Sequence, residues 1–162
     1  MKSDLASRLD EFSRRFAAEL FARFPDLEQY IVTPKDFQKT HGFFIESPCP
    51  HPSELQWPLY IWTESGKEVS VGLDACHTHF TCSDEQNESQ VFAEAIKFLD
   101  DIFLERTVVM SWVPPEGNFK GRLAGSSFNT PAEIEKEIAD TPSGFIVRVR
   151  SWKGTFLQDH KT

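Results

Sequence analysis

The stretch Glu68-Val-Ser-Val-Gly-Leu-Asp-Ala-Cys-His-Thr-His-Phe80 decides the fold that we predict from the sequence. It begins with apolar residues at every second position, as in a half-buried strand; these are Val69, Val71, Leu73 and Ala75. It ends in a cluster of polar residues that could carry chemistry: Asp74, Cys76, His77 and His79. The stretch therefore predicts a strand that leads directly into the candidate functional residues.

A second alternating segment, residues 57–63, comes just before this strand. Its two faces carry Leu59 and Ile61 on one side, and Tyr60 and Trp62 on the other. The connection, Glu64-Ser-Gly-Lys67, is short and contains glycine. Two strands joined by so short a turn form an antiparallel hairpin.

Three segments have the apolar spacing of amphipathic helices. The predicted helices cover residues 4–23, 88–105 and 131–140. Pro25 ends the first helix. Asn87, three residues before a glutamine, resembles the cap of the second, and Thr130 followed by proline is typical of the start of the third.

Further apolar or β-branched segments predict strands at residues 41–46, 107–113, 119–128, 145–152 and 155–157. The predicted order is α-β-β-β-α-β-β-α-β(β), with short turns between adjacent strands. This order is typical of an α+β protein, with a mainly antiparallel twisted sheet and helices packed against it. The length of 162 residues predicts a single α+β domain over residues 1–162.

The net charge of −8, from 17 basic and 25 acidic residues, opposes nucleic-acid binding, which relies on Lys and Arg. It is compatible with a basic protein partner. No apolar run approaches the roughly 20 residues of a membrane span, and the N-terminus lacks the apolar segment of a secretory signal. We therefore expect a cytoplasmic protein that binds neither nucleic acid nor membrane.

The acidic residues are concentrated in one part of the chain. Between positions 84 and 105 Lys97 is the one basic residue, and seven are acidic: Asp84, Glu85, Glu88, Glu94, Asp100, Asp101 and Glu105. The helical spacing places Asp100 and Asp101 on the solvent side of the second helix. This segment predicts an acidic surface next to the histidines.

His77 and His79 point the same way if the chain stays extended. With Asp74 or Asp84 they could supply three ligands to a zinc-like metal. The favoured interpretation is different: the histidines end a strand and are held by backbone or carboxylate hydrogen bonds. We predict no bound metal.

Motifs for other catalytic chemistry are absent from the sequence. There is no phosphate-binding loop, no dinucleotide-binding glycine motif, no nucleophile elbow and no HExxH, so we predict no cofactor. The three cysteines form no CxxC pair, and we expect free thiols in a cytoplasmic chain. A lone catalytic cysteine paired with a distant histidine stays open as an alternative.

The Val-Gly-hydrophobic-Asp step and His-Thr-His-Phe80, followed by an acidic helix, resemble a motif of small bacterial proteins of unknown function, some of which resemble immunity proteins of polymorphic toxin systems. This resemblance covers about a tenth of the chain. It implies a single-domain cytoplasmic inhibitor that binds and neutralises a toxin and has no catalysis of its own. The acidic net charge fits such a role when the toxin is basic.

The sequence thus favours a non-catalytic binding protein with a basic protein toxin as its partner. The predicted partner-binding residues are Asp74, His77, His79, Asp84, Glu85, Asp100 and Asp101. One alternative is a small metal-dependent hydrolase that uses Asp74, His77 and His79. The other is a structural or adaptor domain.

Overall fold

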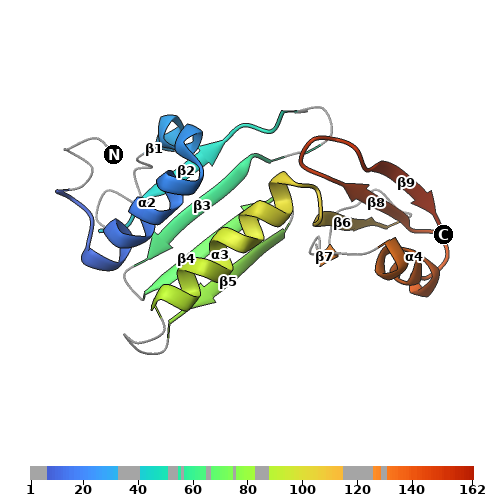
Figure 1. Ribbon diagram of the computed structural model, residues 1–162. Helices are drawn as coiled ribbons and strands as arrows, with labels where there is room; N and C mark the ends of the chain where they lie inside the picture. Colours follow the sequence, from blue (N-terminus) through green and yellow to red (C-terminus); the bar gives the residue numbers. More distant parts are fainter. Residues whose placement is uncertain are drawn as a thin grey trace. The chain divides into compact units, whose positions relative to one another are not determined.

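The computed structural model describes residues 7–32, 41–50, 55, 57–64, 67–74, 76–82, 88–114, 126–128 and 131–162. Figure 1 shows the elements along the chain. In chain order they are α2 (Glu11–Arg23), the 3-10 helix η1 (Pro25–Tyr30), β1 (Ile31–Val32), β2 (Phe44–Ser47), β3 (Leu59–Glu64), β4 (Glu68–Leu73), β5 (Cys76–Thr81), α3 (Glu88–Phe103), β6 (Val108–Val113), β7 (Ser126–Phe128), α4 (Pro131–Asp140), β8 (Ile146–Arg150) and β9 (Leu157–Lys161).

The structure confirms the α+β class and the broad order of the elements, but the strands form two antiparallel sheets instead of one. The first sheet has the order β1-β2-β3-β4-β5, and the second has the order β7-β6-β8-β9. The chain groups into two compact units, one around each sheet. No helix in the described part of the chain is both long and apolar enough to cross a membrane.

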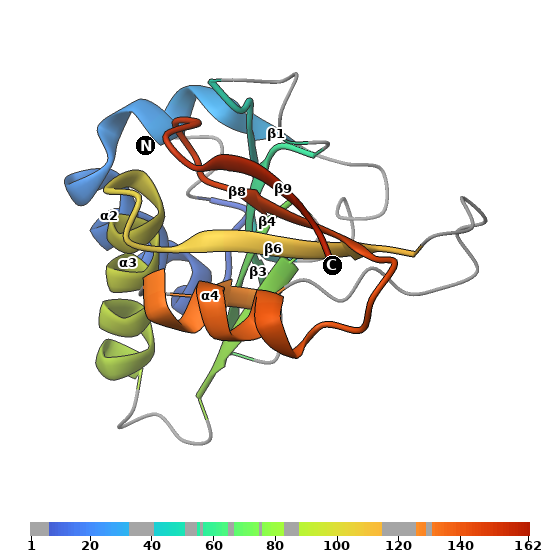
Figure 2. The ribbon, with the colours of Figure 1, turned by 90° about the vertical axis from the view of Figure 1, so that its right-hand side faces the viewer.

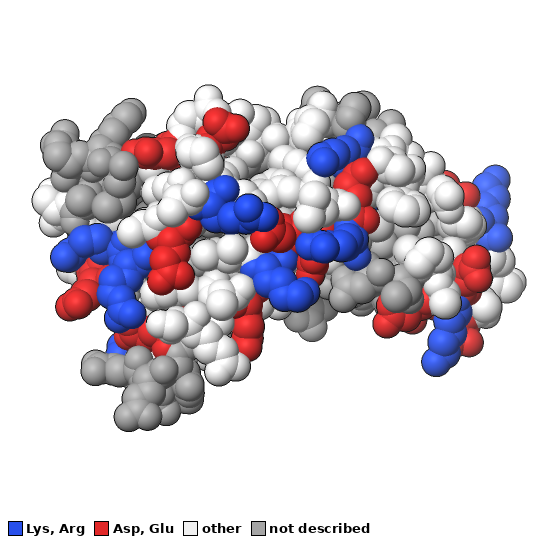
Figure 3. All heavy atoms as spheres, viewed as in Figure 1, with Lys and Arg blue, Asp and Glu red and all other residues white. Residues whose placement is uncertain are grey.

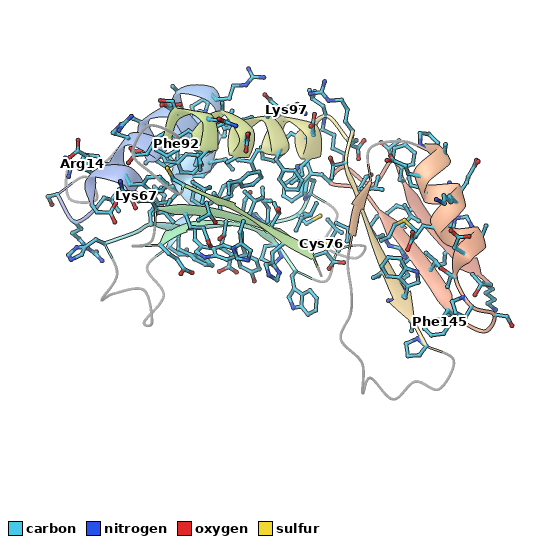
Figure 4. The ribbon with its side chains drawn as sticks, turned by 90° about the horizontal axis from the view of Figure 1, so that it is seen from below. Arg14, Lys67, Cys76, Phe92, Lys97 and Phe145 are labelled. Atoms are coloured by element: carbon cyan, nitrogen blue, oxygen red, sulfur yellow. The ribbon has the colours of Figure 1, made fainter. Side chains whose placement is uncertain are left out.

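The core of the first unit lies between its sheet and the helices α2 and α3, which Figure 4 shows on the same face of the sheet. Phe16 of α2 is fully buried there. Its ring centroid lies 5.9 Å from that of Phe43 and 5.3 Å from that of Phe92 on α3. The aromatic stripe predicted for the first helix is therefore part of the core, as apolar residues at helical spacing usually are.

Helix α2 begins later than predicted. The side chain of Asp10 accepts a hydrogen bond of 2.7 Å from the backbone N–H of Ser13, so Asp10 caps a helix that starts at Glu11. At the other end the helix stops before Pro25, as expected. Of the predicted start, residues 4–6 lie outside the described residues.

Residues 68–80 form two strands where one was expected. Strand β4 ends at Leu73, and Asp74 takes a left-handed conformation with φ of 50°. Asp is one of the few residues besides Gly that adopt this conformation readily. The chain turns there and continues as β5, so His77 and His79 lie inside a strand and not beyond the end of one.

The two strands that were predicted to form a hairpin, residues 57–63 and the strand around Val69, are neighbours in the sheet as β3 and β4. Leu59 and Ile61 are fully buried, whereas Tyr60 and Trp62 are half-buried, as their alternation predicts.

The second unit has a separate small core. It is built from Val108, Met110, Val147 and Val149 of the central strands β6 and β8. Ile134 and Ile138 of α4 pack against this cluster, and Figure 2 shows α4 running along the sheet. The last strand, β9, starts at Leu157 and not at residue 155 as predicted, because residues 151–156 form the turn before it.

Candidate interaction surface

The first sheet has an outer face that neither α2 nor α3 covers (Figure 4). The register of β2 and β3 pairs Phe44 with Trp62, and Glu46 with Tyr60, and all four side chains lie on this face. Their neighbours Ile45 and Ile61 are fully buried on the helix side. The alternation of the strands therefore sorts apolar aliphatic residues inward and aromatic and acidic residues outward.

Aromatic rings form a row across this outer face. The indole of Trp62 stacks with Phe44 at a centroid distance of 6.1 Å and an interplanar angle of 28°. On its other side it meets the ring of His79 edge-on, with centroids 6.3 Å apart. The ring centroid of Tyr60 lies 5.6 Å from that of Phe44. The row thus holds Trp62 between rings of β2 and β5.

A hydrogen-bonded cluster lies beside this row on β4 and β5. The Nδ1 of His79 is 2.6 Å from Oε1 of Glu68, and because an ionised carboxylate only accepts, the imidazole donates. Ser70 and Thr81 also donate to Glu68, over 2.8 Å and 3.2 Å. Burial by itself would raise the pKa of Glu68, but the bonds from Ser70, His79 and Thr81 and the charge of His79 hold it below its ordinary value.

The outer face is acidic. The five strands of this sheet contain no Lys or Arg and three carboxylates, Glu46, Glu64 and Glu68. Glu46 and Glu64 are exposed, and the Nε1–H of Trp62 donates to Glu64 over 3.0 Å. Burial and the charge of Glu46 both raise the pKa of Tyr60, consistent with a carboxylate close to that ring.

The helix side of the molecule differs. Figure 3 shows Lys and Arg interspersed with Asp and Glu over the helices α2 and α3. Glu88, at the start of α3, is almost fully buried and pairs with Arg15 at 2.5 Å and with Lys67 at 3.2 Å. Glu88, one of the acidic residues between positions 84 and 105, is thus paired within the protein.

The prediction that Asp101 faces solvent is wrong. Only 8% of Asp101 is exposed, and its carboxylate lies 2.8 Å from Nε of Arg106. Asp100 is half-buried. Glu105 lies beyond the end of α3 and accepts hydrogen bonds from Ser151, Lys153 and Thr155 of the second unit, to which it belongs. Ser151, Lys153 and Thr155 are far from Glu105 in the sequence, so the helical spacing alone did not reveal these hydrogen bonds.

The remaining predicted site residues are placed as follows. Asp84 and Glu85 lie outside the described residues. Asp74, in the turn, accepts a hydrogen bond of 3.3 Å from the backbone N–H of Trp57. His77 and His79 are both exposed on β5, two residues apart and therefore on the same face of the sheet, and His79 contacts Trp62 there.

Asp74, His77 and His79 are not arranged as a metal site. Among the described residues no group of three His, Cys, Asp or Glu side chains is placed to hold a metal ion. Asp74 instead accepts a hydrogen bond from the backbone N–H of Trp57, and His79 donates one to Glu68.

The environment of Cys76 disfavours a thiolate. None of the three cysteines is in a disulfide, and Cys49 and Cys82 are buried. Burial, together with the charge of Asp74, raises the pKa of the Cys76 thiol to about 11. A nucleophilic cysteine needs a lowered pKa, because the thiolate is the reactive form.

Sequence reasoning missed most of the outer face as a site: Phe44, Glu46, Tyr60, Trp62, Glu64 and Glu68. Its signal was present, because these residues occupy the outward positions of strands that the sequence predicts. They are spread over three strands with no local run of charge, so a search for acidic segments does not detect them.

Comparisons with protein-family models, with curated proteins and with solved structures each returned no match.

Proposed function

We propose that this chain is a non-catalytic binding protein that holds a basic protein partner on the outer face of the sheet β1–β5. One observation carries the proposal: this face has three carboxylates and an aromatic row, and its strands contain no Lys or Arg. Aromatic residues are enriched at protein interfaces, and complementary charge speeds association and suppresses wrong partners.

The finer proposal concerns the class of partner. The resemblance of the His-Thr-His-Phe80 stretch to immunity proteins implies a toxin, and a basic toxin matches the charge of the outer face. A cytoplasmic location belongs to the same proposal, since an inhibitor of this kind acts where the toxin acts. The sequence placed the acidic contact on α3. The internal pairing of Glu88 and Asp101 favours the sheet instead.

The test measures binding kinetics with the product of the gene adjacent to the one that encodes this chain. The variant Glu46→Gln/Glu64→Gln removes two exposed charges and keeps the side-chain size, including an oxygen that can accept from Trp62. We expect association to slow severalfold at low salt, and the difference to shrink at high salt, because salt screens exposed charges.

The matched control is Glu19→Gln/Glu94→Gln, which removes the same charge from exposed positions of α2 and α3. The control should associate nearly as fast as the wild type. An equal loss in both variants would assign the effect to net charge alone, and an unchanged rate in the Glu46/Glu64 variant would remove the sheet from the interface.

A further inference from the structure

The outer face places a carboxylate directly beside an indole. Trp62 and Glu64 are two residues apart on β3, and the indole Nε1–H donates to Glu64 Oε1 over 3.0 Å. This bond fixes the orientation of both side chains. Glu64 remains exposed, so its charge faces solvent at the edge of a half-buried ring.

The indole is also held from its sides. Phe44 stacks with it from β2, and His79 contacts it edge-on from β5. Side chains that are already fixed before binding lose little rotamer freedom when a partner arrives. The pair Trp62–Glu64 is therefore already arranged by these contacts before a partner binds.

A second pair of the same kind lies next to it. Tyr60 and Glu46 are directly opposite each other on β3 and β2. Each pair combines an aromatic ring with a carboxylate, which is the combination that attracts a cation through the ring face and through its charge. The five strands contain no Lys or Arg, so none of their own side chains supplies this cation.

Arginine fits these pairs better than lysine. Its guanidinium is planar, stacks on aromatic rings and donates several hydrogen bonds in a fork that matches a carboxylate. It is also more weakly hydrated than an ammonium, so it loses less when it lies against a ring. Lysine offers a point charge that does not stack.

We infer that the partner presents an arginine side chain that lies against Trp62 and pairs with Glu64. This inference rests on the proposed function, since it names the group through which a basic partner is recognised. Tyr60 and Glu46 provide a second position for an arginine beside the first.

The test uses three capped hexapeptides of arginine, lysine and citrulline. Citrulline is planar but neutral, so it separates shape from charge. Binding is followed by NMR through the indole N–H signal of Trp62, which is assigned by its disappearance in Trp62→Phe. We expect hexa-arginine to shift this signal and to bind about two- to fivefold more tightly than hexa-lysine, the range of an exposed cation–π contact. Hexa-citrulline should not bind.

Glu64→Gln should weaken hexa-arginine and remove most of the difference between the two cationic peptides, while Glu19→Gln should leave both unchanged. Equal binding of hexa-arginine and hexa-lysine, or no shift of the Trp62 signal by hexa-arginine, would overturn the arginine inference. Neither result would contradict the proposal that the partner is basic. Peptide binding that persists in full in Glu46→Gln/Glu64→Gln would count against both proposals.

Discussion

The carboxylate of Glu68 and the imidazole Nδ1 of His79 lie 2.6 Å apart on the neighbouring strands β4 and β5. Ser70 Oγ lies 2.8 Å from each of these two atoms, and Thr81 donates to the other carboxylate oxygen. The cluster ties β5 to β4 on the outer face, beside the aromatic row. It therefore links the stability of the sheet to the charge state of one carboxyl group.

This link predicts a pH-dependent effect of Glu68→Gln. Because the folded pKa of Glu68 is lower than its ordinary value of 4.5, its contribution to stability is fully present above 4.5 and is lost as pH falls through the folded pKa. We expect the variant to lose about 1 kcal/mol of unfolding free energy at neutral pH, a modest figure because the pair is partly exposed. Chemical denaturation over a range of pH measures the difference, and a gap independent of pH would contradict it.

A second carboxylate holds a turn in the other unit. Glu105 accepts hydrogen bonds from the Ser151 hydroxyl and from the backbone N–H groups of Lys153 and Thr155, over 2.6, 2.8 and 3.3 Å. The Thr155 hydroxyl donates to it as well. Glu105→Ala should therefore cost about 1–3 kcal/mol of unfolding free energy, because it removes the acceptor of four bonds.

The backbone at Glu105 provides a matched comparison. Its φ of 55° is left-handed, which glycine adopts without strain. Glu105→Gly should thus be more stable than Glu105→Ala by roughly 0.5–1 kcal/mol, although both lose the carboxylate. Urea denaturation of the two variants tests this order, and an alanine variant as stable as the glycine variant would show that the strain has no effect.

Gly42 is predicted to tolerate no side chain. A Cβ at this position would lie 2.0 Å from the backbone oxygen of Thr63. Thr63 has little room to move, because its hydroxyl is 2.7 Å from that of Ser13 and accepts from the backbone N–H of Phe43. Gly42→Ala should lower the unfolding free energy by about 1–3 kcal/mol, as overpacking does. Glu19→Ala, at an exposed helix position, is the control, and equal stability of the two variants would contradict the clash.

The core of the first unit gives a further test at Phe16. Its side chain is fully buried between Phe43 and Phe92. Truncation to alanine should cost about 3–5 kcal/mol, whereas Phe16→Leu, which keeps most of the volume, should cost clearly less. A loss below about 1 kcal/mol for Phe16→Ala in thermal or chemical denaturation would mean that α2 contributes little to this core.

We expect that folding requires no metal. In a chelator dialysis the thermal midpoint should stay unchanged, since a structural zinc would contribute roughly 10 kcal/mol or more. The structural reason is that Asp74 accepts a hydrogen bond from the backbone N–H of Trp57, and that His79 donates one to Glu68. A fall in the midpoint that zinc restores would return the histidines to a metal-binding role.

The sequence by itself determined the local elements. The alternation in residues 57–63 predicted which side chains of β3 are buried, and the Thr-Pro-Ala-Glu pattern predicted the helix Pro131–Asp140. Both signals depend on backbone preferences and on the repeat of one element, which neighbouring residues specify. The α+β class followed from the order of these elements.

Only the tertiary structure decided which charges face solvent and how the strands divide into sheets. Glu88 pairs with Arg15, 73 positions away, and Glu105 binds a turn 46 to 50 positions away. The outer face likewise gathers Phe44, Trp62 and His79 from three strands. Such contacts depend on long-range packing, which no local spacing encodes. Two carboxylates of the acidic run, Glu88 and Asp101, are thus buried and paired within the protein, whereas strand pairing brings Glu46, Glu64 and Glu68 together on one face.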